Sequence, residues 1–193
     1  TINREDFAAA NGMGAKRTAF IHGIGLDTAR LENPTGNLRE ELGLKNKDFL
    51  VLSLGELNRN KDHATALRAI AWLQDDRVHY AICGKGTLLG KLEALAASLG
   101  IRERVHFLGY RRDLANLYGG ADLFLHPSRR EGLGLAVLEA VQGGLPVVAS
   151  AVGGVPDMLR DQESGLLVSC EPAEIAEAVC RLLDSEKLRI TLG

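Results

Sequence analysis

The feature that most constrains this chain is a regular alternation of short apolar runs with helical patterns, which begins at Phe49. The first run, FLVLSLG at 49–55, is apolar throughout, as expected for a strand that is covered on both faces. Further predicted strands lie at 78–84, 104–109, 121–126, 147–150 and 165–168. Strands that alternate with helices at this spacing predict an α/β fold with a doubly wound, Rossmann-like parallel sheet of about six strands.

Helical patterns fill the gaps between these strands. We predict helices over 61–73 with Asn58 or Asn60 as the cap, over 87–100, from Asp113 to Tyr118, from Gly134 to Gly143, at Pro156, and from Pro172 to the end of the chain. The expected strand order places a switch point between the first and fourth strands. Open sheets of this type bind ligands there, outside the carboxyl ends of the strands. We therefore look for the site in the loops that follow the strands.

The beginning of the chain has a different pattern. Residues 1–15 suit a short strand end and a short helix, and the pair Asn33 and Pro34 marks a boundary. We interpret residues 1–33 as a connector and the tail of a preceding domain, and residues 34–193 as one Rossmann-like domain. Because the sequence opens without a methionine, we expect it to be a fragment of a longer protein.

Composition excludes several classes of function. The net charge of −2 gives no bulk electrostatic reason to bind nucleic acid or an anionic membrane. No apolar run approaches the roughly 20 residues of a transmembrane helix, and no signal-peptide pattern opens the chain. The cysteines, Cys83, Cys170 and Cys180, lack metal-ligand spacing, and two of them fall in apolar patterns that predict burial. A reducing cytosol is the expected compartment.

The loops after the first four predicted strands are rich in basic residues. They contain Arg59, Lys61, Lys85, Arg111, Arg112, Arg129 and Arg130. Loops that converge on one edge of a sheet would sum their fields at a shared crevice, which favours an anionic ligand. Surface loops carry Arg and Lys in many proteins, which is the alternative explanation. The acidic residues of these loops do not balance the basic ones equally.

The stretch HPSRREGLGLAVLEAVQGGLPVVAS, residues 126–150, predicts strand, loop, helix, turn and strand. Gly132 and Gly134 let a ligand approach the backbone, and the first N–H groups of the helix would favour an anion there. Glu131 precedes the helix, and Glu139 lies inside it among apolar neighbours. Hydroxyl groups of a bound sugar or ribose would offset the cost of burying these carboxylates. Alternatively, Glu131 complements the helix dipole and Glu139 is an ordinary solvated residue.

Other motifs carry less information. The glycine pattern at 84–86 differs from the dinucleotide fingerprint, so it is either a plain strand-to-helix turn or a phosphate or base contact. No phosphate-binding lysine loop, nucleophile elbow or zinc-ligand spacing is present. We therefore expect no metal site and no cofactor.

The histidines are dispersed along the sequence. His79 and His106 fall inside predicted strands, and we interpret them as packed residues. His63 in the first turn of a predicted helix and His126 at a strand end stay open between a functional and a structural role.

Several blocks of the sequence resemble one family. EGLGLAVLEAVQGGLPVVAS resembles the signature of the retaining glycosyltransferases of family 4, in which a Glu is followed by seven residues and another Glu. Further blocks agree in order and spacing: GELNRNKDH (55–63), CGKG (83–86), VHFLGYRRDLANLYGGADLFLHPS (105–128) and GGVPDMLRDQESGLLV (153–168). IHGIGLD (21–27) is similar to the family's connector, and TINREDF (1–7) to the end of its first domain. The resemblance implies the C-terminal, donor-binding half of a two-domain GT-B enzyme.

The resemblance also implies roles for single residues. Glu131, the expected catalytic residue, matches the residue that contacts the donor sugar near its reacting carbon, and Glu139 matches the residue that binds the ribose. Lys61 corresponds to the lysine that clamps the diphosphate, and Tyr110 lies where the backbone meets the base. The backbone positions expected to line the donor are Gly55, Gly84, Gly86, Gly132, Gly134, Leu135 and Ala136, the last three of them at the diphosphate.

One position departs from the family pattern. Many relatives have Arg directly after Gly55, paired with Lys61 on the phosphates, and this chain has Glu56 there. A carboxylate cannot clamp a diphosphate. Our hypothesis is that Arg59 supplies the second cation.

The reaction that the resemblance implies is transfer of a hexose from a nucleoside-diphosphate sugar, a UDP-sugar first of all, to an acceptor hydroxyl, with retention and without a metal. The acceptor, a glycan or glycolipid of bacterial polysaccharide or glycoconjugate synthesis, would bind through the other domain. We expect a cytoplasmic protein, in contact with the inner face of the membrane in its full-length form, and a fragment that binds donor without transferring it. A non-catalytic nucleotide-sugar binding module, and a sugar-nucleotide epimerase or phosphorylase of similar architecture, stay open as alternatives.

Overall fold

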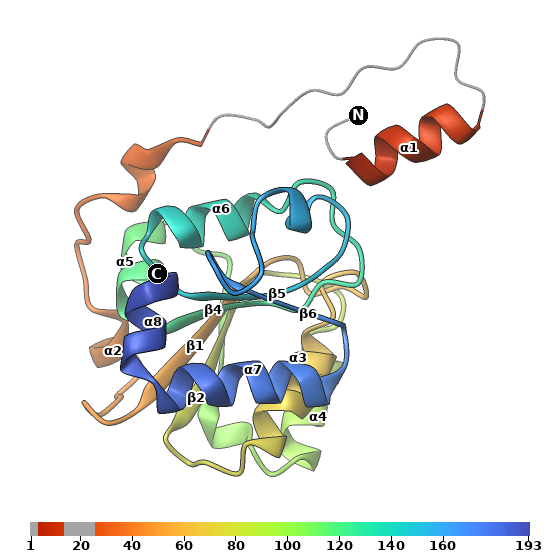
Figure 1. Ribbon diagram of the computed structural model, residues 1–193. Coiled ribbons are helices and arrows are strands. Elements are labelled where there is room, and N and C mark those ends of the chain that lie inside the picture. Colours follow the sequence, from red (N-terminus) through yellow and green to blue (C-terminus); the bar gives the residue numbers. More distant parts are fainter. Residues whose placement is uncertain (1–3, 14–25) are drawn as a thin grey trace.

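The computed structural model describes residues 4–13 and 26–193 of the chain. It contains one parallel sheet of six strands in the order β3-β2-β1-β4-β5-β6 (Figure 1). The strands are β1 (Phe49–Leu54), β2 (Val78–Cys83), β3 (Val105–Gly109), β4 (Leu123–His126), β5 (Val147–Ser150) and β6 (Leu166–Val168). The strand order reverses between β1 and β4, so the predicted fold class and the predicted switch point are both confirmed.

Helices cover both faces of the sheet. They are α1 (Arg4–Gly12), α2 (Leu38–Glu41), α3 (His63–Trp72), α4 (Leu89–Ser98), α5 (Leu114–Gly120), α6 (Leu135–Gln142), α7 (Pro172–Asp184) and α8 (Glu186–Leu192), with short 3-10 helices η1 (Thr28–Leu31), η2 (Arg102–Arg104) and η3 (Val155–Asp157). One core cluster joins α3, α4 and α7 to the sheet, and the other joins α5 and α6 to the opposite face (Figure 1). This is the doubly wound arrangement that βαβ connections produce.

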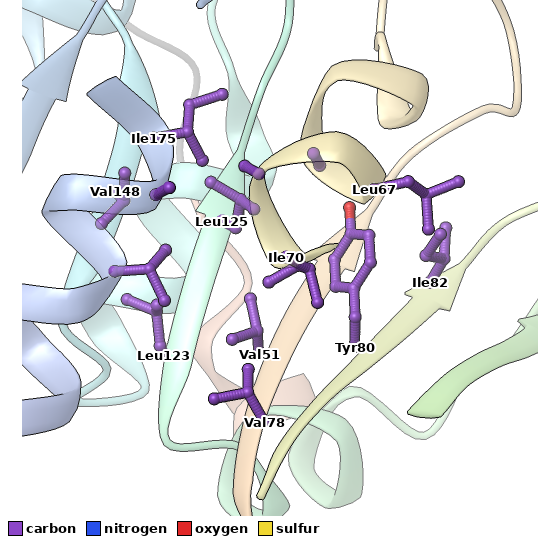
Figure 2. Close-up of a cluster of buried hydrophobic side chains, with 14 of the residues drawn as sticks. Val51, Leu67, Ile70, Val78, Tyr80, Ile82, Leu123, Leu125, Val148 and Ile175 are labelled. Atoms are coloured by element: carbon purple, nitrogen blue, oxygen red, sulfur yellow. The ribbon is translucent and has the colours of Figure 1, made fainter. Parts of the chain in front are cut away.

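The central strand β1 explains why its sequence is continuously apolar. Leu50 and Leu52 lie in the core under α5 and α6, whereas Val51 lies in the core under α3 and α7, and all are fully buried. Figure 2 shows the core cluster under α3 and α7, where Val51 and Tyr80 from the sheet meet Ile70 of α3. Successive side chains of a strand point to opposite faces, so a strand covered on both sides needs apolar residues at every position.

The start of α3 differs from the prediction. The helix begins at His63, two residues later than expected, because Asp62 before it has a left-handed backbone with a φ of 43°. Asn58 does not cap this helix. Its side-chain oxygen accepts hydrogen bonds from the backbone N–H groups of Asn60 (2.9 Å) and Lys61 (3.0 Å), which folds the loop into a tight turn.

Two further details also correct the prediction. The last predicted helix is divided into α7 and α8, because the extended Ser185 ends the first, and its hydroxyl accepts a hydrogen bond from Leu188 N to start the second. Asp113 stands at the N-cap position of α5 without a side-chain capping bond. Its carboxylate instead accepts hydrogen bonds from Arg111 and Asn116.

The segment before Pro34 makes contact with the domain where it is described. The predicted short helix near the start is α1, and the backbone N–H of Arg4 donates to Asp157 Oδ2 (3.1 Å). Leu31 of η1 packs against the core under α5 and α6. Most of the IHGIGLD block, and the first residues of TINREDF, lie outside the described residues.

Two properties that composition predicted can be compared with the structure. Of the three cysteines only Cys83 is buried, whereas Cys170 is half-buried and Cys180 is exposed, so the expectation of two buried cysteines was wrong. In the part of the chain that the structure describes, none of the helices has the length and apolar character needed to cross a membrane.

Candidate functional site

A cavity of about 420 Å³ opens at the carboxyl edge of the sheet. We call it the rim cavity. It is lined by Arg30, Leu54, Gly55, Glu56, Cys83, Gly84, Lys85, Tyr110, Arg111, Leu114 and Glu139. The loops after β1, β2 and β3 contribute most of these residues, which is the location that a switch point between β1 and β4 predicts.

Glu139 comes to the rim cavity from α6. It is half-buried, and its Oε2 accepts a hydrogen bond from the Tyr118 hydroxyl (3.0 Å). Burial and the Glu139 carboxylate raise the pKa of Tyr118 strongly, so the phenol stays protonated and donates. Glu139 therefore forms part of a cavity wall, and one of its hydrogen-bond donors is already provided by the protein.

Gly84 and Gly86 let the loops after β1 and β2 pack closely together. A Cβ on Gly84 would lie 1.8 Å from the carbonyl oxygen of Gly55, and one on Gly86 would lie 2.4 Å from that of Leu57. The backbones also share a hydrogen bond from Leu57 N to Lys85 O (3.0 Å). Loop packing thus explains both glycines, and Gly84 additionally lines the rim cavity.

Beside the rim cavity, Glu131 joins two loops through its carboxylate. Its Oε2 accepts a hydrogen bond from the Lys61 ammonium and one from His126 Nε2 (2.9 Å), and its Oε1 accepts from the Gly132 backbone N–H (3.1 Å). The Lys61 stem passes over Gly55, where a Cβ would lie 3.1 Å from Lys61 Cδ. The structure thus brings Lys61, Gly55 and Glu131 together, and it adds His126, whose role the sequence left open.

The charges of this group are set by burial and by contact. Burial acts to raise the pKa of Glu131, but the hydrogen bonds from His126 and Lys61 outweigh it and lower that pKa to about 2. Burial lowers the pKa of His126. Burial also lowers the pKa of His63, and the nearby His126 and Lys61 lower it further, to about 4. At neutral pH the site therefore holds an ionised carboxylate between an ammonium and a neutral imidazole.

The N-terminus of α6 follows Glu131 after a short loop. Gly134 precedes the helix with a left-handed φ of 73°, and Val137 N bonds back to Gly134 O (2.8 Å). Within residues 4–13 and 26–193, the N–H groups of Gly134, Leu135 and Ala136 have no hydrogen-bond acceptor. Free N–H groups at a helix start, together with the helix dipole, favour an anion.

The loop before α6 is held from behind by the loop after β5. Gly154 N donates to Gly132 O (3.0 Å), and a Cβ on Gly153 would lie 1.8 Å from Glu131 O. Gly153 also has a left-handed φ of 55°, so this position favours glycine for two reasons. The β5 loop, part of the GGVPD block, thus fixes the backbone that presents Glu131.

The predicted cations do not share a single crevice. Lys85 and Arg111 line the rim cavity, but Arg111 is already paired with Asp113 (2.5 Å) and Glu41 (2.6 Å). Arg59 lines a separate hollow of about 320 Å³. The expectation of one shared crevice was wrong, because the cations line separate hollows and Arg111 is held in ion pairs, by Asp113 of its own loop and by Glu41.

The basic pair after β4 does not line the rim cavity. Arg129 and Arg130 line a hollow of about 490 Å³ together with Glu131 and residues of α1. Arg129 Nε is paired with Asp62 Oδ2 (2.5 Å), and Arg129 also borders the hollow that Arg59 lines. Arg129 and Arg130 thus border the same hollow as Glu131, and neither of them pairs with Glu131 in the described part of the chain.

Three further residues, Tyr110, Glu56 and Arg30, line the rim cavity. Tyr110 is exposed there, and the Arg112 guanidinium lies 6.0 Å from its ring centroid. Glu56, the departure from the family pattern, also lines the cavity and accepts a hydrogen bond from Asn58 Nδ2 (2.9 Å). Arg30, which comes from η1, was missed by sequence reasoning because no pattern in the connector marks it.

No group of three or more His, Cys, Asp or Glu side chains is placed to hold a metal ion, as far as the described ranges extend.

Comparison with known proteins matches this chain to one family and to similar sequences. The family model described as "Glycosyl transferases group 1" matches residues 35–193. The chain is 33% identical over 202 residues to EpsD of Bacillus subtilis, covering 100% of this chain and 53% of that protein. It is 38% identical over 190 residues to the D-inositol 3-phosphate glycosyltransferase of Salinispora arenicola, covering 88% and 42%. The chain therefore spans about half the length of these curated relatives.

Solved structures agree with this match. HepE of Anabaena, crystallised in complex with UDP and glucose, is similar with a TM-score of 0.89 and 25% identity, over 99% of this chain and 55% of HepE. WaaG, a glycosyltransferase involved in lipopolysaccharide biosynthesis, is similar with a TM-score of 0.86 and 27% identity, over 100% and 55%. The structures of these proteins share the doubly wound fold described above.

Proposed function

The chain belongs to the glycosyl transferases group 1 family, and from this premise we propose that it is the donor-binding part of a retaining enzyme that transfers a sugar from a nucleoside diphosphate to an acceptor hydroxyl. The observation that carries the proposal is that three features lie next to one another at the carboxyl edge of the sheet. They are the start of α6, whose first N–H groups have no acceptor among the described residues, the Lys61–Glu131 pair, and the rim cavity that Glu139 lines. These features fit the phosphates, the sugar and the ribose of a nucleotide sugar.

UDP-sugars are the donors that we propose first. HepE, with its TM-score of 0.89, was crystallised with UDP and with UDP-glucose. In our proposal the base lies near Tyr110, the ribose at Glu139, and the diphosphate at the N-terminus of α6 and Lys61. The sugar would then reach Glu131 from the diphosphate.

The mechanism that we propose relies on electrostatic stabilisation of the leaving group. Negative charge builds up on the diphosphate as its bond to the sugar breaks. The Lys61 ammonium and the N–H groups of Leu135 and Ala136 would stabilise that charge without a metal ion. Glu131 would orient the sugar through its hydroxyl groups. A carboxylate that already accepts hydrogen bonds from Lys61, His126 and Gly132 suits that role better than nucleophilic attack.

A binding screen tests the donor assignment. We expect UDP, UDP-sugars, GDP-sugars and ADP-sugars to differ in the rise of melting temperature that they cause in this chain, with UDP-sugars the largest. A ligand at a hundredfold excess over its Kd stabilises a protein by about 2.7 kcal/mol, which such a screen detects readily. The proposal is wrong if none of these nucleotides changes the melting temperature.

A transfer assay tests the rest. We propose that transfer requires the remainder of the enzyme, since the chain spans about half of its curated relatives, and that the acceptor is a glycan or glycolipid of polysaccharide or glycoconjugate synthesis. Activity of the full-length protein should survive excess EDTA. Strict dependence on Mn²⁺ or Mg²⁺ would contradict the metal-free mechanism.

We propose the cytoplasm as the location. The free thiols of Cys83, Cys170 and Cys180 support a reducing compartment. A glycolipid acceptor would bring the full-length enzyme to the inner face of the membrane.

A further inference from the structure

His126 is a buried polar residue whose contacts concern the proposed sugar site. It ends β4, is only 2% exposed, and stacks against Phe124 with 6.2 Å between ring centroids. Its Nε2 lies 2.9 Å from Glu131 Oε2 and 3.1 Å from Ser128 Oγ. The imidazole is therefore held by the strand and its packing, and one nitrogen points at Glu131.

The protonation of the two groups follows from their contact. Burial acts against ionisation of Glu131, but His126 and Lys61 lower its pKa to about 2, so the carboxylate is an acceptor only. His126 is buried and its pKa is lowered, so it is neutral at neutral pH and carries one ring proton. Only the tautomer with that proton on Nε2 can donate to Glu131.

The donor complex creates a conflict that His126 resolves. In the structure Lys61 donates to Glu131, but in the proposed complex the same ammonium binds the diphosphate. Lysine is a flexible point charge that can turn from one partner to the other, whereas a buried ring cannot. After that change the Oε2 of the carboxylate still accepts from His126 at 2.9 Å and, at the longer distance of 3.5 Å, from the Ser128 hydroxyl, and its Oε1 accepts from the Gly132 N–H.

We propose that His126 is a positioning residue for the donor sugar, because its Nε2–H fixes the Glu131 carboxylate while Lys61 moves to the diphosphate. The inference rests on the proposed function. The carboxylate keeps its free lone pairs turned toward the sugar hydroxyls, which is the preorganisation that oriented binding needs. His126 itself does not touch the substrate.

Three variants separate positioning from packing. His126→Gln keeps an N–H donor at a similar reach, His126→Leu keeps a similar volume without a donor, and Phe124→Leu disturbs the packing on the same strand while leaving the donor. Their melting temperatures show which of them fold. Each folded protein is then titrated with UDP and with UDP-glucose by calorimetry.

We expect His126→Leu to weaken UDP-glucose binding by about tenfold or more, the usual effect of losing a hydrogen bond to a charged group. UDP lacks the sugar, so its affinity should stay within about twofold, and His126→Gln should recover most of the UDP-glucose affinity. Equal weakening of UDP and UDP-glucose in His126→Leu, or no recovery in His126→Gln, overturns the inference. If the unaltered chain binds neither ligand, it is the proposed function that fails.

A second readout needs no ligand. Carbon-13 NMR of the Glu131 carboxyl group gives its pKa directly. The titratable groups in contact are Lys61 and His126, with His63 next to both, and the charged residues Arg129, Arg130, Glu5 and Asp6 line the same hollow as Glu131. In His126→Leu the pKa of Glu131 should rise from about 2 by about one unit or more. Burial raises this pKa, and the hydrogen bond from His126 that opposes the effect is lost in the variant. In His126→Gln the rise should be smaller. An unchanged pKa in His126→Leu overturns the inference whatever the nucleotides do.

Discussion

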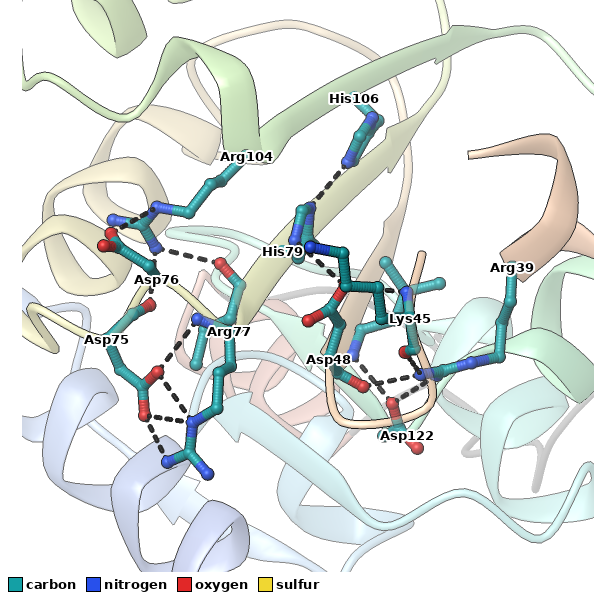
Figure 3. A network of polar contacts seen from close by, with 12 residues as sticks. Arg39, Lys45, Asp48, Asp75, Asp76, Arg77, His79, Arg104, His106 and Asp122 are labelled. Carbon is teal, nitrogen blue, oxygen red and sulfur yellow. Dashed lines mark hydrogen bonds and ion pairs between the residues drawn. The ribbon is translucent and has the colours of Figure 1, made fainter. Parts of the chain in front are cut away.

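The two ends of the sheet differ in how their charged groups are used. At the amino edge, before the strands begin, acidic and basic side chains are paired with one another (Figure 3). Arg39 binds Asp122 (2.7 Å) and also donates to backbone carbonyls, including that of Asp48 (2.5 Å), while Asp122 accepts from Leu50 N (2.7 Å). These groups satisfy the backbone where β1 and β4 start.

The same edge continues with a second network. Asp75 accepts several bonds from Arg77, and Arg104 donates to the carbonyl of Val78 (2.9 Å). His79 and His106 lie 3.1 Å apart through their ring nitrogens, in agreement with the packed role predicted for them. Figure 3 shows these side chains turned toward one another.

The carboxyl edge instead keeps donors and acceptors available. The N–H groups of Leu135 and Ala136 have no acceptor within the described part of the chain, and Lys61 and Glu131 meet beside an open cavity. At the amino edge, arginine side chains donate to backbone carbonyl groups, which satisfies them within the protein. At the carboxyl edge, the N–H groups at the start of α6 have no acceptor among the described residues, and such groups favour an anion. The comparison teaches that the charged groups of one edge satisfy one another and the backbone, whereas the other edge keeps the groups that we propose bind a ligand.

Asp122→Ala should have the largest effect, and on stability. It leaves the buried Leu50 N–H without its acceptor and Arg39 without its carboxylate. We expect a loss of about 4 kcal/mol of unfolding free energy in urea denaturation. Nucleotide binding by the folded fraction should not change, and a selective loss of UDP affinity would break the comparison.

Lys61→Ala should do the reverse. It removes the cation that we assign to the diphosphate, so we expect affinity for UDP to fall about a hundredfold, equivalent to about 3 kcal/mol. Stability should change less than in Asp122→Ala, since His126 and Gly132 still bind Glu131. Calorimetry with UDP and urea denaturation of the same protein give both values, and Lys91→Ala on α4, outside the hollows described above, is the control.

His63 should make the carboxyl edge sensitive to acid. Burial, His126 and Lys61 lower its pKa in the folded chain from 6.5 to about 4. The unfolded chain therefore binds more protons between those values, and stability is lost as the pH falls through this window. From pH 7 to pH 5 we expect His63 to account for about 2 kcal/mol of that loss.

The matched variant is His63→Asn, which cannot titrate and can still donate to the Tyr80 hydroxyl that now lies 3.3 Å from His63 Nδ1. Its stability should depend less on pH over this range than that of the unaltered chain. His79, His106 and His126 also have lowered pKa values, so part of the slope remains. Parallel curves for the two proteins would show that His63 is not the cause.

Arg59→Ala should have the smallest effect and tests the replacement for the missing arginine. Arg59 is exposed and lines a hollow apart from the rim cavity. If it reaches the diphosphate, UDP affinity should fall about fivefold, well below the effect of Lys61→Ala. An unchanged affinity rejects the hypothesis, and Arg68→Ala, an exposed residue of α3, is the control.

Local sequence was sufficient for the repeating elements. β5 at 147–150 was predicted with its observed bounds, and the other strands were predicted to within two residues, because continuous apolar runs reflect burial on both faces. The start of α3 was not predictable in this way. Asn58 is a good capping residue, but it forms a turn, and the left-handed Asp62 then delays the helix.

The sequence by itself determined the order of strands and helices, the resemblance to one family, and therefore the edge of the sheet at which we propose the site. These depend on periodicity and on motifs that are close together in the chain. The tertiary structure alone decided which charges remain available. Arg111 is neutralised by Asp113 and the distant Glu41, and Glu131 meets Lys61 only when β1 and β4 are paired. The pairs of Arg111 with Glu41 and of Lys61 with Glu131 join residues that are 70 positions apart, so no local pattern can reveal them.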